Sequence, residues 1–532
     1  MRKLPHLAHL LGVTSAERWI TLAIVSVAIL ARLVPGPRMI DDAFITFRYA
    51  RNVVHGVGFV YNAGERVLGT TTPFYTLLMA ALSLLTHTEN YPLLALVTNA
   101  LADAANSFLL YHLGRRLSGS PLVGWAAALL WAIAPWSVSF AIGGMETSVF
   151  ILLMLGTFTA HLHHRSYLSA VLAALAFLTR PDAALIVALV LGQIFWENLK
   201  QVTDRSLPGS HLKFEIWRLK LALMWLLIFA LVIGPWFVFA TAYYGSPIPQ
   251  SVSAKSLAYR LPPEAALGRF IQHFAVPFSE SQVFDMGGLL RLVLYLTLYL
   301  AAMLAAFRHE PRTRSVPLLA YPLLYAAVFA IANPLIFRWY LTPPLPGYML
   351  GILLGIHRIL NIQYPIPKLG IRHWVLGAVV AWYLLSGLHA WTLHPDHGLD
   401  RPAPKMAYIQ LELLYHQAAA DLKSHVNTNT VIAAGDIGAL GYDTNARILD
   451  TLGLISPQTL HYYPLDKNLY VTAYAMPPQL ILDERPDWIV SPEVYIRNGV
   501  LKETRIQAQY ELFETIPTDI YDSHGLLVFR LK

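Results

Sequence analysis

Long apolar segments recur through the first three quarters of this chain, and most have the length that crosses a lipid bilayer. A helix needs roughly 17 to 25 apolar residues to span the hydrocarbon core. We predict such spans at 19–36, 91–113, 121–141, 146–162, 166–179, 181–197, 219–242, 286–307, 315–333, 336–357 and 373–392. With 56% hydrophobic and 13% charged residues, the chain has too much apolar surface for one soluble core. The sequence therefore predicts a polytopic α-helical membrane protein with about 11 transmembrane helices. The segments 166–179 and 181–197 are short, so one re-entrant hairpin is an alternative for that pair.

Basic residues set the expected orientation of these spans. Cytoplasmic loops carry an excess of Lys and Arg, so we place the amino terminus, Arg115-Arg116 and the loop 308–314 inside. The apolar stretch 73–85 is expected to be an interfacial helix on the outer surface, because a span there would move Arg115-Arg116 outside. The outer side then receives a first loop at about 37–90 and everything after about residue 394. Basic inner loops account for much of the net charge of +7, so this charge does not indicate nucleic acid.

The composition changes near residue 394, where the apolar segments end. We therefore expect a transmembrane domain at 1–394 and a soluble domain at 395–532. A helix at 407–426 precedes a strand at 431–434, and further strands are expected at 488–491 and 526–531. Helix alternating with strand is typical of an α/β domain. On the predicted topology this domain is extracytoplasmic, and the absence of cysteine excludes disulfides from it.

An acidic pair, Asp41-Asp42, follows the first apolar segment directly. A carboxylate near hydrocarbon is costly, so two of them at the membrane boundary indicate chemistry. One Asp is explained by a helix N-cap, but the second is not. Asp41 and Arg48 share one stripe of a helix of period 3.6, so a general base and a phosphate-binding cation would lie side by side. An ordinary amphipathic helix with a solvated charged face is the alternative.

Several short motifs around this pair occur in a fixed order along the chain. They begin with Asp41-Asp42-Ala-Phe-Ile-Thr-Phe-Arg48-Tyr49 and continue with Gly144-Met145-Glu146-Thr147, Thr179-Arg180-Pro181-Asp182, Tyr244-Gly245-Ser246-Pro247 leading to Ala254-Lys255, and Arg338-Trp339-Tyr340. In this order they resemble the membrane glycosyltransferases of the GT-C superfamily. The nearest likeness is to the branch with the mycobacterial terminal β-arabinofuranosyltransferases. The chain departs from that branch at Thr70-Thr71-Thr72 and at Ser246, which puts arabinose itself in question.

The resemblance implies an activity and a cellular location. It implies inverting transfer of a sugar, arabinofuranose or another pentose or hexose, from a polyprenyl-phosphate donor. The acceptor would be a glycan, lipid or protein of the cell envelope, on the outer face of the bacterial cytoplasmic (inner) membrane. Two other functions remain alternatives: a transporter, and a non-catalytic scaffold with a GT-C-like fold. The outer position of the polar motifs disfavours a transporter, whose sites typically lie near the membrane midplane.

The resemblance also implies roles for individual residues. Asp41 and Asp42 are the expected catalytic pair, with Asp41 as general base and Asp42 as its helper toward the acceptor or a metal. The cations expected at the donor phosphate are Lys255, Arg338 and Arg48. Glu146 and Tyr340 are expected to bind substrate.

Structural alternatives stand beside these roles. Lys255 would serve equally as a snorkelling lysine, Arg338 as an interfacial anchor and Glu146 as a charge at a helix amino terminus. Arg180 and Asp182 are expected to pair with each other across Pro181. The run 435–441 has glycine spacing that differs from a dinucleotide loop, so we expect a tight turn. Asp41 and Asp42 suit Mg²⁺ or Mn²⁺, but no complete ligand set is evident, and no cofactor is assigned.

Overall fold

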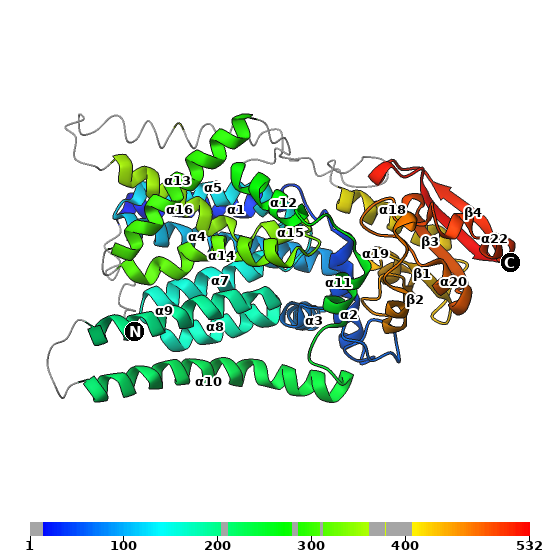
Figure 1. Ribbon diagram of the computed structural model, residues 1–532, viewed down its shortest axis with the longest axis horizontal. Helices are drawn as coiled ribbons and strands as arrows, with labels where there is room; N and C mark the ends of the chain where they lie inside the picture. Colours follow the sequence, from blue (N-terminus) through cyan, green and yellow to red (C-terminus); the bar gives the residue numbers. More distant parts are fainter. Residues whose placement is uncertain (1–13, 204–210, 279–285, 309–311, 361–377, 379–406) are drawn as a thin grey trace.

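The computed structural model describes residues 14–203, 211–278, 286–308, 312–360, 378 and 407–532. A bundle of long helices forms one end of the molecule and a mixed α/β domain the other, as Figure 1 shows. The helices of the bundle and of its connecting segments are α1 Ser15–Leu33, α2 Asp41–Val54, α3 Pro73–Thr86, α4 Tyr91–Ser118, α5 Pro121–Ile133, α6 Pro135–Ile142, α7 Thr147–Leu162, α8 Ser166–Thr179, α9 Ala184–Thr203, α10 His211–Tyr244, α11 Gln250–Ala258, α12 Ala265–Ala275, α13 Met286–Arg308, α14 Val316–Ala332, α15 Arg338–Leu341 and α16 Leu345–Leu360.

The apolar segments of the sequence form the helices of the bundle. Each of the first ten predicted spans contains a helix, while the eleventh, 373–392, falls almost wholly outside the described residues. Among the described residues, three helices are long and apolar enough to cross a membrane alone: Tyr91–Ser118, Lys220–Tyr244 and Gly287–Arg308. The bent pair α5 and α6 makes a fourth if it counts as one span. The predicted number of about 11 is therefore not confirmed.

Two of the predicted spans differ from the helices that the structure contains. The span expected at 121–141 breaks at Ala134, because Pro135 begins α6, and the two halves are bent by 45°. The span expected at 336–357 instead begins at Leu345 in α16. Residues 334–344 before it form a loop and the short helix α15. The stretch predicted to be an interfacial helix is the helix α3, which packs on α2, α4 and α8.

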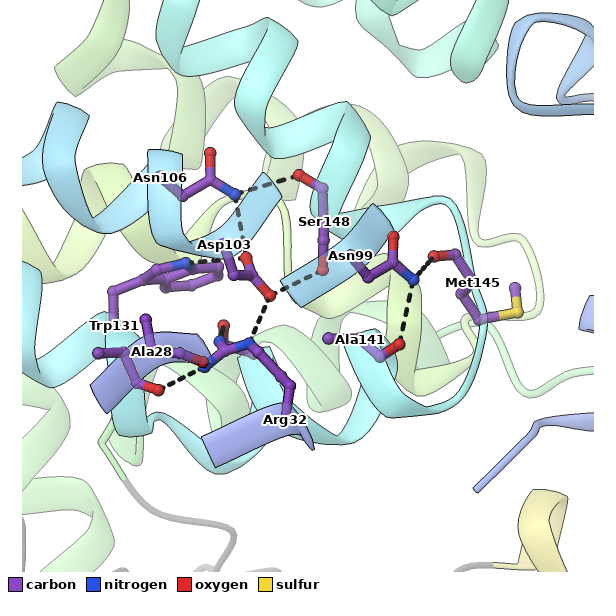
Figure 2. Close-up of polar contacts among 11 residues, drawn as sticks. Ala28, Arg32, Asn99, Asp103, Asn106, Trp131, Ala141, Met145 and Ser148 are labelled. Atoms are coloured by element: carbon purple, nitrogen blue, oxygen red, sulfur yellow. Dashed lines mark hydrogen bonds and ion pairs between the residues drawn. The ribbon is translucent and has the colours of Figure 1, made fainter. Parts of the chain in front are cut away.

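A buried ion pair holds the bundle together. Arg32 of α1 donates from Nε to the Asp103 carboxylate of α4 at 2.9 Å, and both side chains are fully buried. Asp103 also accepts from Trp131 of α5 and from Ser148 of α7, so one carboxylate joins four helices (Figure 2). A buried charge is tolerated when its partners satisfy it in this way. The pair therefore fixes how these helices pack.

The C-terminal domain contains a five-stranded mixed sheet in the order β2-β1-β3-β5-β4. Its strands are β1 Val431–Ala434, β2 Arg447–Asp450, β3 Trp488–Pro492, β4 Tyr510–Ile516 and β5 Leu526–Leu531, and its helices are α18 Ala407–Leu422, α19 Gly438–Thr444, α20 Pro478–Glu484, α21 Glu493–Ile496 and α22 Thr504–Gln509. Strands β2 and β3 run parallel to β1, while β5 is antiparallel to both β3 and β4. The strands predicted at 431–434, 488–491 and 526–531 are present as β1, β3 and β5, whereas β2 and β4 were not predicted. The predicted boundary at 394 lies outside the described residues.

The C-terminal domain docks on α2 through the first turns of α19. Asp41 accepts hydrogen bonds from the backbone N–H groups of Gly438 at 2.9 Å and Ala439 at 2.8 Å. A Cβ on Gly438 would lie 1.8 Å from the Asp41 carbonyl oxygen, so only glycine allows this approach. Arg48 donates to the carbonyls of Gly441 at 2.8 Å and Ala446 at 2.7 Å. The run 435–441, predicted to be a turn, includes the start of a short helix that receives α2.

Candidate active site

Two cavities meet between the bundle and the C-terminal domain. The larger, of about 630 Å³, lies against α11, the end of α14 and the loop before α15. The smaller, of about 160 Å³, is covered by the C-terminal domain. Asp42, Lys255 and Tyr259 line both cavities. A concave site of this kind, with a few convergent ionisable groups, is where a substrate would be expected to bind.

Asp42 lies at the junction of the two cavities as the second residue of α2. Burial raises the pKa of its carboxyl, and the positive charge of Lys255 partly offsets this increase. Within the described part of the chain, no side chain or backbone N–H donates a hydrogen bond to this carboxylate. Asp42 is therefore a partly buried carboxylate that is open to a ligand.

Lys255 supplies the positive charge beside Asp42. It lies on α11, and its ammonium sits 5.0 Å from the ring centre of Phe337 and 5.9 Å from that of Tyr340. Burial alone would lower the pKa of Lys255, but Tyr340 and the Asp42 carboxylate outweigh burial and raise it. The ammonium thus stays charged, with aromatic faces beneath it. The structure brings Lys255, Asp42 and Tyr340 together around the larger cavity, three residues that the sequence predicted for the site.

Asp41 differs from its neighbour, although it also lines the smaller cavity. Burial raises the pKa of its carboxyl to about 7, against the effect of the two N–H donors from α19. Both carboxylate oxygens are occupied by those donors. The side chain is therefore fixed by the C-terminal domain, and Asp42 is better placed than Asp41 to meet a substrate.

Charged side chains that pair with one another form part of the wall of the larger cavity. Arg180 binds Glu146 at 3.0 Å and Asp182 at 2.7 Å, and Tyr325 donates to Asp182 at 3.0 Å. The predicted pairing of Arg180 with Asp182 is thereby confirmed. Glu146 reaches the cavity wall, as expected of a substrate-binding residue, but its carboxylate already has Arg180 as a partner.

Two predicted phosphate ligands lie elsewhere. The Arg48 guanidinium is buried over the Tyr61 ring and held by carbonyl oxygens of the C-terminal domain. It lines neither of the two cavities, and its contacts join α2 to the C-terminal domain; binding of the donor phosphate by Arg48 stays a prediction. Arg338 begins α15 and also lines neither cavity.

The C-terminal domain contributes residues that the sequence did not predict for the site. Asp436 lies two residues after the end of β1 and lines the smaller cavity with Tyr474, Tyr495 and Tyr521. Burial, and then the nearby charges of Asp41 and Asp42, raise the pKa of Asp436 to about 8. An Asp at the carboxyl end of a parallel strand was the available signal, because such ends often line sites.

The described residues contain no group of three or more His, Cys, Asp or Glu side chains that would hold a metal ion. Asp41 and Asp42 provide two carboxylates, one of which is occupied by backbone donors. A divalent ion at this pair stays a prediction.

Comparison with solved structures shows that this chain shares the fold of ArnT. The crystal structure of ArnT from Cupriavidus metallidurans in the apo state aligns with a TM-score of 0.59 at 14% identity, covering 97% of this chain and 98% of that one. The same protein bound to undecaprenyl phosphate aligns with a TM-score of 0.57 at 13% identity, with coverage of 97% and 98%. The likeness covers nearly the whole of both chains, so it includes the C-terminal domain as well as the bundle.

Other comparisons add less. The cryo-EM structure of the arabinosyltransferase EmbB from Mycobacterium smegmatis aligns over 77% of this chain and 40% of that one, at 14% identity; with a TM-score of 0.40 it carries no weight. Residues 405–529 match a domain family of unknown function, DUF8728. No curated protein sequence matches the chain.

Proposed function

We propose that this protein is a glycosyltransferase that moves a sugar from a polyprenyl-phosphate donor to an envelope acceptor. The site would face the outer side of the bacterial cytoplasmic membrane. The observation that carries this proposal is the junction of the two cavities, where Asp42, open to a ligand, and Lys255 lie together. One cavity is available for the donor and the other for the acceptor. The ArnT fold, found in one structure with bound undecaprenyl phosphate, supports the choice of donor.

The larger cavity suits a lipid-linked donor. Its wall includes apolar side chains such as Phe329, Leu335 and Trp339, and Lys255 also lines it. A lipid phosphate binds to a cation whose charge is not already neutralised. Arg180 lies between two carboxylates, so Lys255 is the better phosphate ligand. Glu146 and Tyr340 on the same wall would contact the donor sugar.

Asp42 is the proposed general base, with Asp41 in a positioning role. The Asp42 carboxylate takes the proton of the acceptor hydroxyl as that oxygen bonds to the anomeric carbon of the sugar. The bond between the anomeric carbon and the phosphate oxygen breaks, and the electron pair leaves with polyprenyl phosphate. Lys255 stabilises the negative charge that this oxygen gains. Attack opposite the leaving group inverts the anomeric centre, as the resemblance implies.

Polyprenyl phosphate released from the donor is the direct readout of this proposal. The purified protein is placed in vesicles with a bacterial envelope extract that supplies both polyprenyl-phosphate sugars and envelope acceptors, and mass spectrometry follows the bare lipid phosphate. We expect release by the unmodified protein and by Asp519→Asn, an exposed residue that lines neither cavity. Asp42→Asn should release at most about a hundredth as much, because the base is lost.

Two outcomes would contradict the proposal. Equal release by Asp42→Asn and the unmodified protein would remove Asp42 from the chemistry. No release at all, together with movement of the lipid-linked sugar or another solute across the vesicle membrane, would favour a transporter.

A further inference from the structure

We propose that the smaller cavity is the acceptor subsite and that it takes a neutral saccharide, which stacks along a track of tyrosines and presents a hydroxyl between Asp42 and Asp436. This inference rests on the proposed function, because it names the acceptor of the same reaction. The residues that carry it belong mainly to the C-terminal domain.

The tyrosine track runs from the junction of the cavities to the surface. Tyr259, which lines both cavities, lies 6.2 Å from Tyr474 between ring centres. Tyr474 lies 5.0 Å from Tyr495, and Tyr495 lies 6.4 Å from Tyr521 in a stacked arrangement. Tyr521 is 37% exposed, so the track is open at this end. Aromatic rings present flat apolar faces at low cost in side-chain entropy, and the C–H faces of sugar rings match them.

The inner part of the track is built for close approach. Gly435 precedes Asp436, and a Cβ at this glycine would lie 2.9 Å from the Tyr474 ring. The absence of a side chain there lets the ring lie beside the backbone of Asp436. The Tyr474 hydroxyl is held at 2.6 Å from that of Thr451, and Tyr415 donates to Asp436 at 3.1 Å. Ring and carboxylate are thus both fixed before a ligand binds.

The outer end of the track is held in an uncommon backbone conformation. Tyr521 has φ 56° and ψ 30°, and the next residue, Asp522, has φ 62°. Residues other than glycine rarely adopt backbone angles in this left-handed region. The carbonyl of Asp522 accepts a hydrogen bond from Arg497 at 2.7 Å, which fixes the turn. Backbone strain of this kind gathers at ligand sites, and here it aims a tyrosine at the cavity mouth.

Charge selects among acceptors with hydroxyl groups. Three carboxylates, Asp41, Asp42 and Asp436, line the smaller cavity, and two cations, Lys255 and Arg269, face them. Lys255 is committed to the donor phosphate, and Arg269 donates to the Ile336 carbonyl. A phosphorylated acceptor headgroup would lie beside the ionised Asp42 carboxylate and the donor phosphate, and this repulsion between like charges costs binding energy. A neutral, hydroxyl-rich saccharide meets hydrogen-bond acceptors and aromatic faces instead.

The test measures saccharide binding with bare polyprenyl phosphate bound, so that Lys255 is occupied, and then the kinetics of transfer. The probes are neutral di- to tetrasaccharides and their singly phosphorylated counterparts, titrated calorimetrically into the full-length protein. We expect the neutral probes to bind more tightly, and Tyr521→Ala and Asp436→Asn each to weaken that binding at least tenfold. In transfer assays the same variants should raise the acceptor concentration at half-maximal rate at least tenfold, and the donor concentration less than twofold. Tyr462→Ala, in the same domain but lining neither cavity, should change neither value.

The results separate the two proposals. Saccharide binding without any release of polyprenyl phosphate would contradict the proposed function and keep the subsite. Release that proceeds while neutral saccharides neither bind nor accept the sugar would overturn the subsite and leave the function standing. Tighter binding of phosphorylated probes, or equal effects of Tyr462→Ala and Tyr521→Ala, would also overturn it.

Discussion

The Arg32–Asp103 pair in the bundle is fully buried and the Asp42–Lys255 pair at the cavities is partly buried, and the two pairs differ in how completely their charges are satisfied. The Asp103 carboxylate accepts from Arg32, Trp131, Ser148 and Asn106, as Figure 2 shows. The Asp42 carboxylate accepts no hydrogen bond from the described residues and borders two cavities. A saturated charge fixes helix packing, whereas an open one is available to a substrate.

Removing one member of the saturated pair should give the largest effect on stability. Asp103→Leu leaves the Arg32 guanidinium buried without its carboxylate, which should cost about 3–5 kcal/mol. The double variant Arg32→Met, Asp103→Leu should recover most of that loss, since no charge remains buried. Unfolding of the purified protein in detergent measures both. A double variant no more stable than the single one would show that the pair does more than satisfy its own charges.

Removing the cation of the open pair should act on turnover rather than on folding. Lys255→Met deletes the charge that faces the leaving phosphate, and we expect a loss of about 10²- to 10³-fold in the rate of polyprenyl phosphate release. Lys255→Arg should restore part of the rate, because it restores the charge. The melting temperature should change little in either variant. A large fall in melting temperature for Lys255→Met would instead place Lys255 with the structural charges.

The contact between α2 and α19 should show an intermediate effect. Gly438→Ala places a Cβ against the Asp41 backbone and forces α19 away, which should cost about 1–3 kcal/mol. Turnover should fall as well, because α19 would no longer hold Asp41, the neighbour of Asp42. Gly268→Ala is the matched control, since its Cβ would meet nothing within 4 Å. Thermal unfolding of the two variants makes the comparison, and equal melting temperatures would contradict this account of the docking.

The pH dependence of turnover should show the smallest effect. Asp42 must be ionised to act as a base, so activity falls as the pH falls through its pKa. Because burial raises that pKa, the acid limb should lie above pH 3.8, the ordinary value for Asp. Lys255 opposes this increase, so its removal should raise the pKa of Asp42 further. The acid limb of the residual activity of Lys255→Met should therefore lie at higher pH than that of the unmodified protein. If the acid limb of Lys255→Met lies at the same pH as that of the unmodified protein, the charge of Lys255 does not affect Asp42.

The sequence predicted the features of this protein that depend on local pattern. The length of the apolar segments indicated the helices of the bundle, and the order of the short motifs assigned Asp42, Lys255 and Tyr340 to one site. The features of the site that the sequence did not predict depend on contacts between segments that are distant in the chain. Asp41 and Gly438 are separated by 397 positions, yet they share a hydrogen bond. Nothing in the spacing near Asp41 and Arg48 indicates that both side chains bind backbone atoms of the C-terminal domain.

The tyrosine track was missed for the same reason. Tyr259 comes from the loop after α11, Tyr474 and Tyr495 from separate segments of the C-terminal domain, and Tyr521 from a turn near its end. Each tyrosine alone is typical of an ordinary core or surface position. Only the folded sheet and its docking on the bundle place their rings in sequence.

The lipid that stays bound to the protein during purification tests the central claim most directly. Native mass spectrometry would compare the unmodified protein with Asp42→Asn, both expressed in bacterial membranes that contain polyprenyl-phosphate sugars. The account predicts that Asp42→Asn retains polyprenyl phosphate with its sugar attached, since the donor binds but is not consumed, while the unmodified protein retains the bare lipid phosphate. Bare polyprenyl phosphate in both proteins, or no polyprenyl lipid in either, would contradict it.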